Sequence, residues 1–177
     1  MRQLIKYYFV LITLNSLGQG MKSEFGRLPT TEEQRQIRVT FQNGIELLGW
    51  IVQLDNELTS ETIVIRLKEA TDKIQKNDIK LPLGDYHEYR DVAMSFSFVF
   101  GQAIVDEFNW AWRFVESDKK LGWHIFSPDN EYCIALEDYF YQRIMWDRKT
   151  QISCVDIFKN LKDNKYTEKN GVLKYLN

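Results

Sequence analysis

The chain of 177 residues contains only two cysteines, Cys133 and Cys154, and only two histidines, His87 and His124. No CxxC pair is present, so these four side chains lack the spacing of a structural zinc site, which takes four cysteine or histidine ligands. The chain also lacks the glycine-rich phosphate loops and the nucleophile elbow that mark nucleotide-binding enzymes and many hydrolases. We therefore expect no cofactor and no bound metal, and we favour a protein that is not an enzyme.

An excess of charge of one sign is also missing, because 23 lysines and arginines face 25 aspartates and glutamates for a net charge of −2. Nucleic-acid-binding proteins need a basic surface to neutralise phosphates, so this balance argues against DNA or RNA as a partner. Only three prolines and no low-complexity segment are present, which argues against extended disorder. The aromatic share of 14% predicts a core or an interface built on Phe, Tyr and Trp.

The first residues have the composition of a targeting segment. A positively charged start is followed by the apolar run 7–14 and by small residues at Ser16 and Gly18. This pattern is typical of a secretory signal peptide over residues 1–20, cleaved after Gly18, which would make the protein periplasmic or exported. The run is too short for a transmembrane helix of about 20 residues, so we expect no stable membrane insertion. The alternatives are a first helix or strand of a cytoplasmic protein, or a start of translation at Met21.

Residues 21–177 are predicted to form one domain that begins with three helices. Thr30 and Glu33 have the spacing of a capping box, a second helix begins at Thr59 or Ser60, and Asp85 caps a third. Apolar residues recur at helical spacing after each cap. They are Ile37, Phe41, Ile45, Leu48 and Val52 in the first helix, Ile63, Leu67, Ala70 and Ile74 in the second, and Tyr89, Ala93, Phe96, Phe100, Ala103 and Ile104 in the third.

Glycines interrupt two of these helices. Gly44 and Gly49 in the first helix predict close packing against a neighbour at those points. Gly101 lies inside the apolar face of the third helix and would allow another backbone to approach it.

The hydrophobic period changes to that of a strand after the third helix. Alternation and intervening turn sequences predict strands at 110–115, 122–126 and 132–136, which form an antiparallel meander. Helical spacing then returns, and Ser153 begins a further short helix. The fold class is therefore α+β, with N-terminal helices packed on a small three-stranded antiparallel meander and short C-terminal helices after it.

Two contacts of this arrangement follow from the pattern. The third helix is the nearest cover for the sheet, so its aromatic face is expected against the tryptophan-rich first strand. The expected contact joins Phe96, Phe100 and Ile104 to Trp110, Trp112 and Phe114. Residues 172–176 are apolar again and form a candidate last strand.

The stretch from Phe96 to Arg143 carries a family resemblance. Its features are Gly101 within the helix sequence FVFGQAIVDEF, Trp110-Ala111-Trp112 at the start of a strand, two further strands, and Arg143 in the helix that follows. This combination resembles the bacterial "domain of unknown function 3806" family over less than a third of the chain. The resemblance implies the fold and a bacterial origin and implies no activity. Similar small domains look like companions of secreted toxins.

Cys133 and His124 lie on neighbouring predicted strands, and Asp138 follows the third strand. A thiol nucleophile needs a base within hydrogen-bonding reach and a third group that orients the base, so these three side chains are the candidates for a catalytic set. The structural interpretation is that a cysteine in the apolar sequence YCIAL is a small buried hydrophobe.

The helix after the third strand combines Arg143 with Tyr139, Tyr141 and Trp146. Arginine among aromatic residues is typical of the anchors in protein–protein interfaces, so we predict that these four residues bind a partner. The structural alternative is an ion pair of Arg143 with Asp138 or its neighbour, which would fix the helix to the sheet.

Two further pairs of residues are candidate sites. His87 and Asp91 stand four residues apart, as in a helical metal pair, but the metalloprotease pattern needs a second histidine at that place. We interpret them as the solvated start of a helix, where acidic side chains suit the dipole. Cys133 and Cys154 are a candidate disulfide if the chain is exported.

The sequence thus favours a non-enzymatic bacterial binding module whose partner is another protein. A toxin is one candidate partner, which would make the chain an immunity-type inhibitor. The alternatives are a hydrolase-like enzyme that uses Cys133 and His124, and an exported structural or envelope protein with the disulfide formed.

Overall fold

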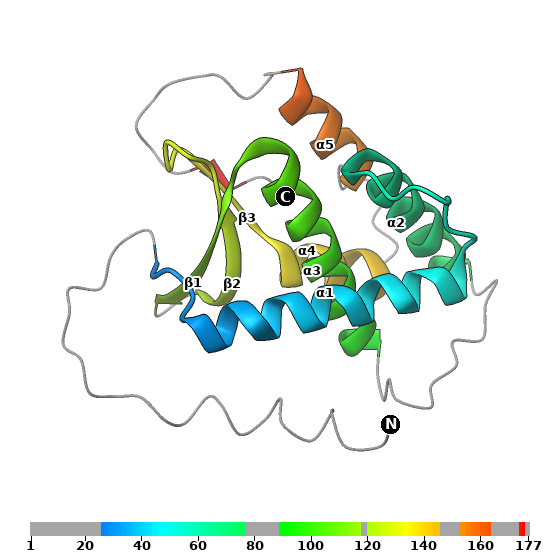
Figure 1. Ribbon diagram of the computed structural model, residues 1–177, viewed down its shortest axis with the longest axis horizontal. Helices are drawn as coiled ribbons and strands as arrows, with labels where there is room; N and C mark the ends of the chain where they lie inside the picture. The colour runs from blue at the N-terminus through cyan, green and yellow to red at the C-terminus, as the bar shows by residue number, and fades with distance from the viewer. Residues whose placement is uncertain (1–25, 77–88, 118–119, 146–152, 164–173, 176–177) are drawn as a thin grey trace.

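The computed structural model describes residues 26–76, 89–117, 120–145, 153–163 and 174–175. The expected signal peptide, the cap at Asp85, His87 and Trp146 lie outside these residues. In chain order the elements are α1 (Thr31–Ile51), α2 (Ser60–Gln75), α3 (Tyr89–Phe108), β1 (Ala111–Ser117), β2 (Lys120–Phe126), β3 (Tyr132–Ala135), α4 (Leu136–Met145), α5 (Cys154–Lys162) and β4 (Lys174–Tyr175). The fold is α+β, as predicted, with three helices before the antiparallel meander and two after it (Figure 1).

The predicted caps begin α1 and α2. The backbone N–H of Glu33 donates to the Thr30 hydroxyl at 3.3 Å, and the backbone N–H of Thr30 donates to the Glu33 carboxylate at 2.8 Å. Thr59 and Thr62 make the same reciprocal pair at the start of α2. Each exchange satisfies backbone donors that the first helical turn leaves without partners, so local sequence fixes where these helices begin.

The sheet has the strand order β1-β2-β3-β4. The first three strands are antiparallel, and the two-residue β4 pairs parallel with β3. The connection between β2 and β3 is a turn, in which the Ser127 hydroxyl accepts a hydrogen bond from the backbone N–H of Tyr132 at 3.0 Å. Asn130 adopts a φ of 61° there, a conformation that asparagine tolerates better than most residues. β3 then continues directly into α4.

The two faces of the sheet contact different side chains. Trp112, Ile125 and Ile134 belong to the large core cluster that contains residues of all five helices. Phe126 lies opposite Cys133 in the register, and both join Val115 in a separate small cluster. Because side chains alternate along a strand, this second cluster lies on the opposite face of the sheet.

α3 is the central helix, and Figure 1 shows it between α1, α2 and the sheet. Phe100 is predicted to pack on the sheet, but the ring contacts of its side chain are with Tyr139 and Phe140 of α4, at centroid distances of 6.1 and 5.7 Å. The sheet contact is made instead by Phe98, which stacks on Trp112 at 5.1 Å. The physical reason is that α4 follows β3 without a loop, which places α4 beside the face of α3 that carries Phe100.

Two glycines are sites of close packing. A Cβ on Gly44 would lie 2.5 Å from the Val99 side chain and 2.8 Å from the carbonyl oxygen of Ser95, so α1 and α3 approach there as predicted. A Cβ on Gly101 would lie 2.3 Å from the Trp112 ring. The predicted approach at Gly101 is therefore made by an aromatic side chain and not by a backbone.

Across the described part of the chain, the search for a helix both long and apolar enough to span a bilayer finds none.

Candidate functional site

The catalytic candidates do not form an accessible site. Cys133 is fully buried and His124 is 4% exposed, and both point to the face of the sheet that holds the small cluster. They are diagonal neighbours, since His124 lies opposite Ala135 in the register. Asp138 is exposed in the first turn of α4. A substrate has no access to the Cys133 thiol in this arrangement, which agrees with the structural interpretation of the strand.

The two cysteines are not joined in a disulfide in the structure. Cys133 belongs to the small cluster, whereas Cys154 lies in the main core, where its thiol approaches the carbonyl oxygen of Val64 at 3.7 Å. The disulfide considered from the sequence is therefore not formed here, because the two side chains pack in different clusters. Burial raises the pKa of the Cys154 thiol to about 12, which keeps it protonated and unreactive.

The predicted partner-binding residues of α4 do not share one surface. Tyr139 is buried, with 1% of its surface exposed, and burial raises the pKa of its hydroxyl far above the ordinary value. Arg143 hydrogen-bonds Tyr139 and opposes that rise, and its carbonyl oxygen accepts from the Gln75 amide of α2. Tyr141 is 38% exposed. Tyr139 and Arg143 thus hold α4 within the fold, and Tyr141 remains on the surface.

The pair His87 and Asp91, interpreted from the sequence as a solvated helix start, is described only in part, since His87 lies outside the described residues. Asp91 is half-buried in the first turn of α3. The described residues contain no cluster of three or more side chains able to hold a metal ion.

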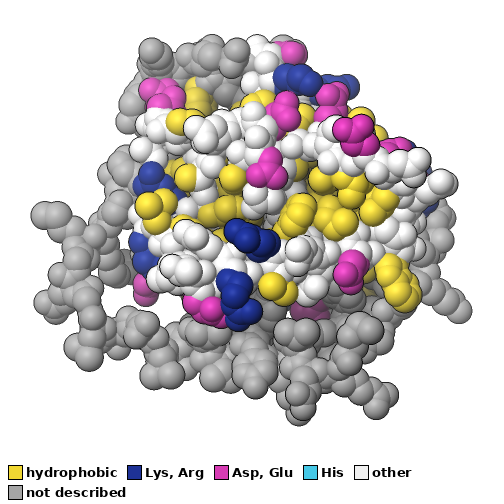
Figure 2. All heavy atoms as spheres, viewed as in Figure 1, with side chains coloured by type: hydrophobic (Ala, Val, Ile, Leu, Met, Phe, Trp, Pro, Cys, Tyr) yellow, Lys and Arg dark blue, Asp and Glu magenta, His cyan; other side chains and the backbone are white. Residues whose placement is uncertain are grey.

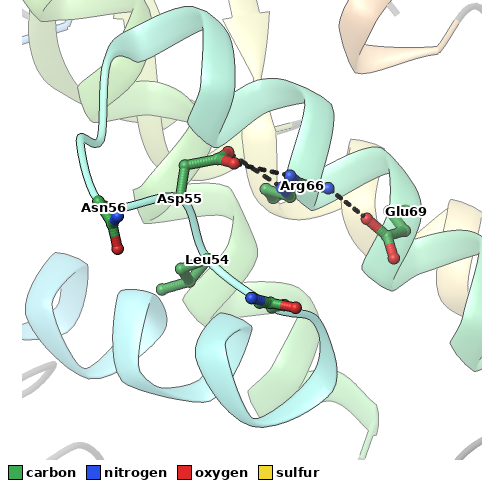
Figure 3. Close-up of a pocket in the computed structure, with 6 residues that line it drawn as sticks. Leu54, Asp55, Asn56, Arg66 and Glu69 are labelled. Atoms are coloured by element: carbon green, nitrogen blue, oxygen red, sulfur yellow. Dashed lines mark hydrogen bonds and ion pairs between the residues drawn. The ribbon is translucent and has the colours of Figure 1, made fainter.

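A polar hollow lies where α1 connects to α2, lined by Gln53, Leu54, Asp55, Asn56, Arg66 and Glu69 (Figure 3). Arg66 occupies it with a bidentate bond to Asp55 at 2.8 and 3.1 Å and a third bond to Glu69 at 3.0 Å. Lys73 pairs with the same Glu69 at 3.1 Å. These ion pairs balance the charges that line the hollow. We therefore interpret them as structural contacts that hold the α1–α2 connection against α2.

A second hollow has a different character. It is lined by Phe41, Gln42, Ile45 and Glu46 of α1, Leu58, Ser60 and Ile63 at the start of α2, and Asp106 of α3. We call this the α1–α2 groove. Of the lining residues that the structure describes, four are apolar, two are acidic and none is basic. Figure 2 shows hydrophobic side chains gathered along α1, with both acidic and basic side chains at their borders.

The position of the Asp106 carboxylate in this groove is fixed from the core. The indole N–H of Trp112 donates to the Gln102 side-chain oxygen at 3.2 Å, and the Gln102 amide donates to Asp106 at 2.7 Å. Asp106 and Glu107 stand in the last turn of α3, which contains no basic residue. The C-terminal end of a helix dipole is negative, so acidic side chains there are electrostatically unfavourable. An external cation near Asp106 would relieve this.

Large hydrophobic side chains are exposed on α1 and just before α2. Trp50, one turn after Glu46 on α1, is 73% exposed, and Leu58 is 40% exposed. Neither residue is part of a site predicted from the sequence. The helical periodicity of α1 could have identified Trp50, because this residue lies off the apolar face of the helix and is therefore expected in solvent. No comparable signal exists for the groove, whose residues come from three separate helices.

Comparison with known proteins gives no match to a protein-family model, to a curated protein or to a solved structure. The resemblance to the "domain of unknown function 3806" family therefore stays a prediction.

Proposed function

We propose that this chain is a non-catalytic protein-binding module and that the α1–α2 groove with Trp50 is its partner-binding site. The carrying observation is the presence of exposed apolar side chains, Trp50 on α1 and Leu58 in the apolar lining of the groove. Tryptophan is enriched among residues that dominate binding energy, and apolar surface that stays accessible after folding often marks a protein interface.

An immunity-type inhibitor of a bacterial toxin is the specific role that we propose for this module. The support is an analogy, since small domains similar to the one that residues 96–143 resemble look like companions of secreted toxins, together with the two acidic residues of the groove, which suit a basic partner. A module of this kind acts by occupying a surface of its partner, so it needs no catalytic group of its own.

The test is affinity capture of the tagged full-length chain from cells of its source, with wild-type and Trp50→Ser baits compared by quantitative mass spectrometry. Trp50 is mostly exposed, so its replacement should leave the fold intact. Leu121→Ser is the matched control, because Leu121 is 61% exposed on β2. We expect one stoichiometric partner with the wild-type and control baits and a several-fold loss with Trp50→Ser.

Repeated capture without a stoichiometric partner would contradict the binding function. A captured enzyme should be inhibited by the purified chain at a one-to-one ratio, and an enzyme that stays fully active in the complex would contradict the inhibitor role alone.

A further inference from the structure

We infer that the α1–α2 groove binds a basic amphipathic helix of the partner protein. This inference rests on the proposed function and specifies the chemistry that the groove recognises.

The shape of the groove favours a helix. Phe41 and Ile45 stand one turn apart on α1, and Leu58 and Ile63 line the groove from the start of α2. Side chains one turn apart form a ridge along a helix surface, and such ridges leave grooves into which another helix packs. A partner helix whose apolar residues recur at the same spacing would cover all four side chains.

The charge of the groove favours a basic helix. Among the described residues that line it, the ionisable ones are Glu46 and Asp106, and both are acidic. The Gln102 amide holds Asp106 in position before any partner arrives, so little ordering is needed for it to pair with a lysine or arginine. The negative end of the α3 dipole adds to the attraction.

The groove also predicts an orientation. Arg38 lies one turn before Gln42 on the same side of α1, outside the lining residues. The field along the groove is therefore asymmetric, and the basic side chains of the partner are expected at the end formed by Glu46 and Asp106.

The test uses defined synthetic peptides and the full-length chain. Two labelled peptides of about 18 residues share leucines at helical spacing and differ in carrying lysine or glutamate at the polar positions. A third has the lysine composition in scrambled order. Fluorescence anisotropy should show the ordered lysine peptide binding about tenfold more tightly than either of the others, with weaker binding at high salt.

Substitutions locate the binding. The double variant Glu46→Gln/Asp106→Asn should weaken binding of the lysine peptide by about three- to tenfold and reduce its salt dependence. Leu58→Ser should weaken it by a similar factor at both salt concentrations, because it removes apolar contact. The matched controls are Glu131→Gln in the β2–β3 connection and Leu121→Ser on β2, which should each leave the affinity within about twofold. Circular dichroism of every variant establishes that it is folded.

Equal binding of all three peptides would overturn the inference, as would an equal loss of affinity in the control variants. A dimer of the full-length chain that Leu58→Ser dissociates would assign the groove to a second copy instead. Tighter peptide binding after Arg2→Glu and Lys6→Glu would assign it to the chain's own basic N-terminal segment. Capture of a partner that depends on Leu58, without a preference for the lysine peptide, would overturn this inference and leave the proposed function standing.

Discussion

Replacing Gly44 with alanine is expected to destabilise the protein by separating α1 from α3. The new Cβ would lie 2.5 Å from the Val99 side chain and 2.8 Å from the Ser95 carbonyl oxygen, where an ordinary carbon contact is about 3.5–4.0 Å. Val99 can rotate, but the Ser95 carbonyl belongs to the backbone of α3 and cannot move alone. The helices must therefore shift apart by about 1 Å to restore normal contact.

The magnitude follows from two opposing terms. Overpacking of a core costs about 1–3 kcal/mol, and alanine recovers up to about 1 kcal/mol because glycine is a poor helix former. The net loss for Gly44→Ala is about 1–2 kcal/mol, measured as the free energy of unfolding in urea. Gly49→Ala is the control on the same helix, since Gly49 is exposed and its nearest contact is the flexible Leu54 side chain at 3.2 Å.

The control should be neutral or stabilised by up to about 1 kcal/mol, because the same gain in helix propensity meets little opposition. Equal stability of the two variants would refute the close approach of α1 and α3 at Gly44. A large loss in both would instead show that helix α1 rejects alanine for a reason unrelated to packing.

Three further predictions concern stability and thiol chemistry. Phe100→Ala should cost about 3–5 kcal/mol in urea unfolding, because the buried ring leaves a cavity beside α4; a loss below 1 kcal/mol would contradict the α3–α4 contact. Arg27 holds the pKa of Glu33 at about 2, below its ordinary 4.5, so this pair stabilises the fold above the unfolded pKa and the contribution is lost as pH falls toward 2. Glu33→Gln should therefore lower stability at pH 7 by about 1–2 kcal/mol, a value reduced because Arg27 is half exposed, and a gap from wild type that persists near pH 2 would contradict the ion pair. Cys133 and Cys154 should react with a thiol reagent only after the protein is denatured, and no reductant should be needed. Fewer than two reactive thiols in the denatured, unreduced protein would contradict the absence of a disulfide.

Local chemistry explains which elements could be predicted from the amino-acid sequence. Thr30 with Glu33, Thr59 with the first turn of α2, and Ser153 with Asp156 satisfy backbone groups within a few residues, so helix starts needed no tertiary information. The strands were predictable for a similar reason, because alternation and turn residues are read along the chain itself.

Only the tertiary structure determines which element packs against each apolar face of a helix or strand. α3 is apolar around most of its circumference, so periodicity could not tell whether Phe100 or Phe98 would meet the sheet. The answer depended on α4, which follows β3 without a loop and occupies the Phe100 side. Likewise, Tyr139 and Arg143 were expected at an interface, but contacts with α2 and α5 draw them inward. Hydrophobic burial is non-directional, and the sequence alone does not specify which apolar surface covers another.

The α1–α2 groove is the clearest case of a feature that only folding produces. Phe41, Leu58 and Asp106 are far apart in the chain and come from α1, the connection before α2, and α3. The local pattern of α1 places Phe41 on its apolar face, but it does not show that this side chain shares a surface with Leu58 and Asp106. Their common surface exists because α1 packs closely on α3 at Gly44 and α2 returns beside them, so the candidate site follows from helix packing and not from a motif.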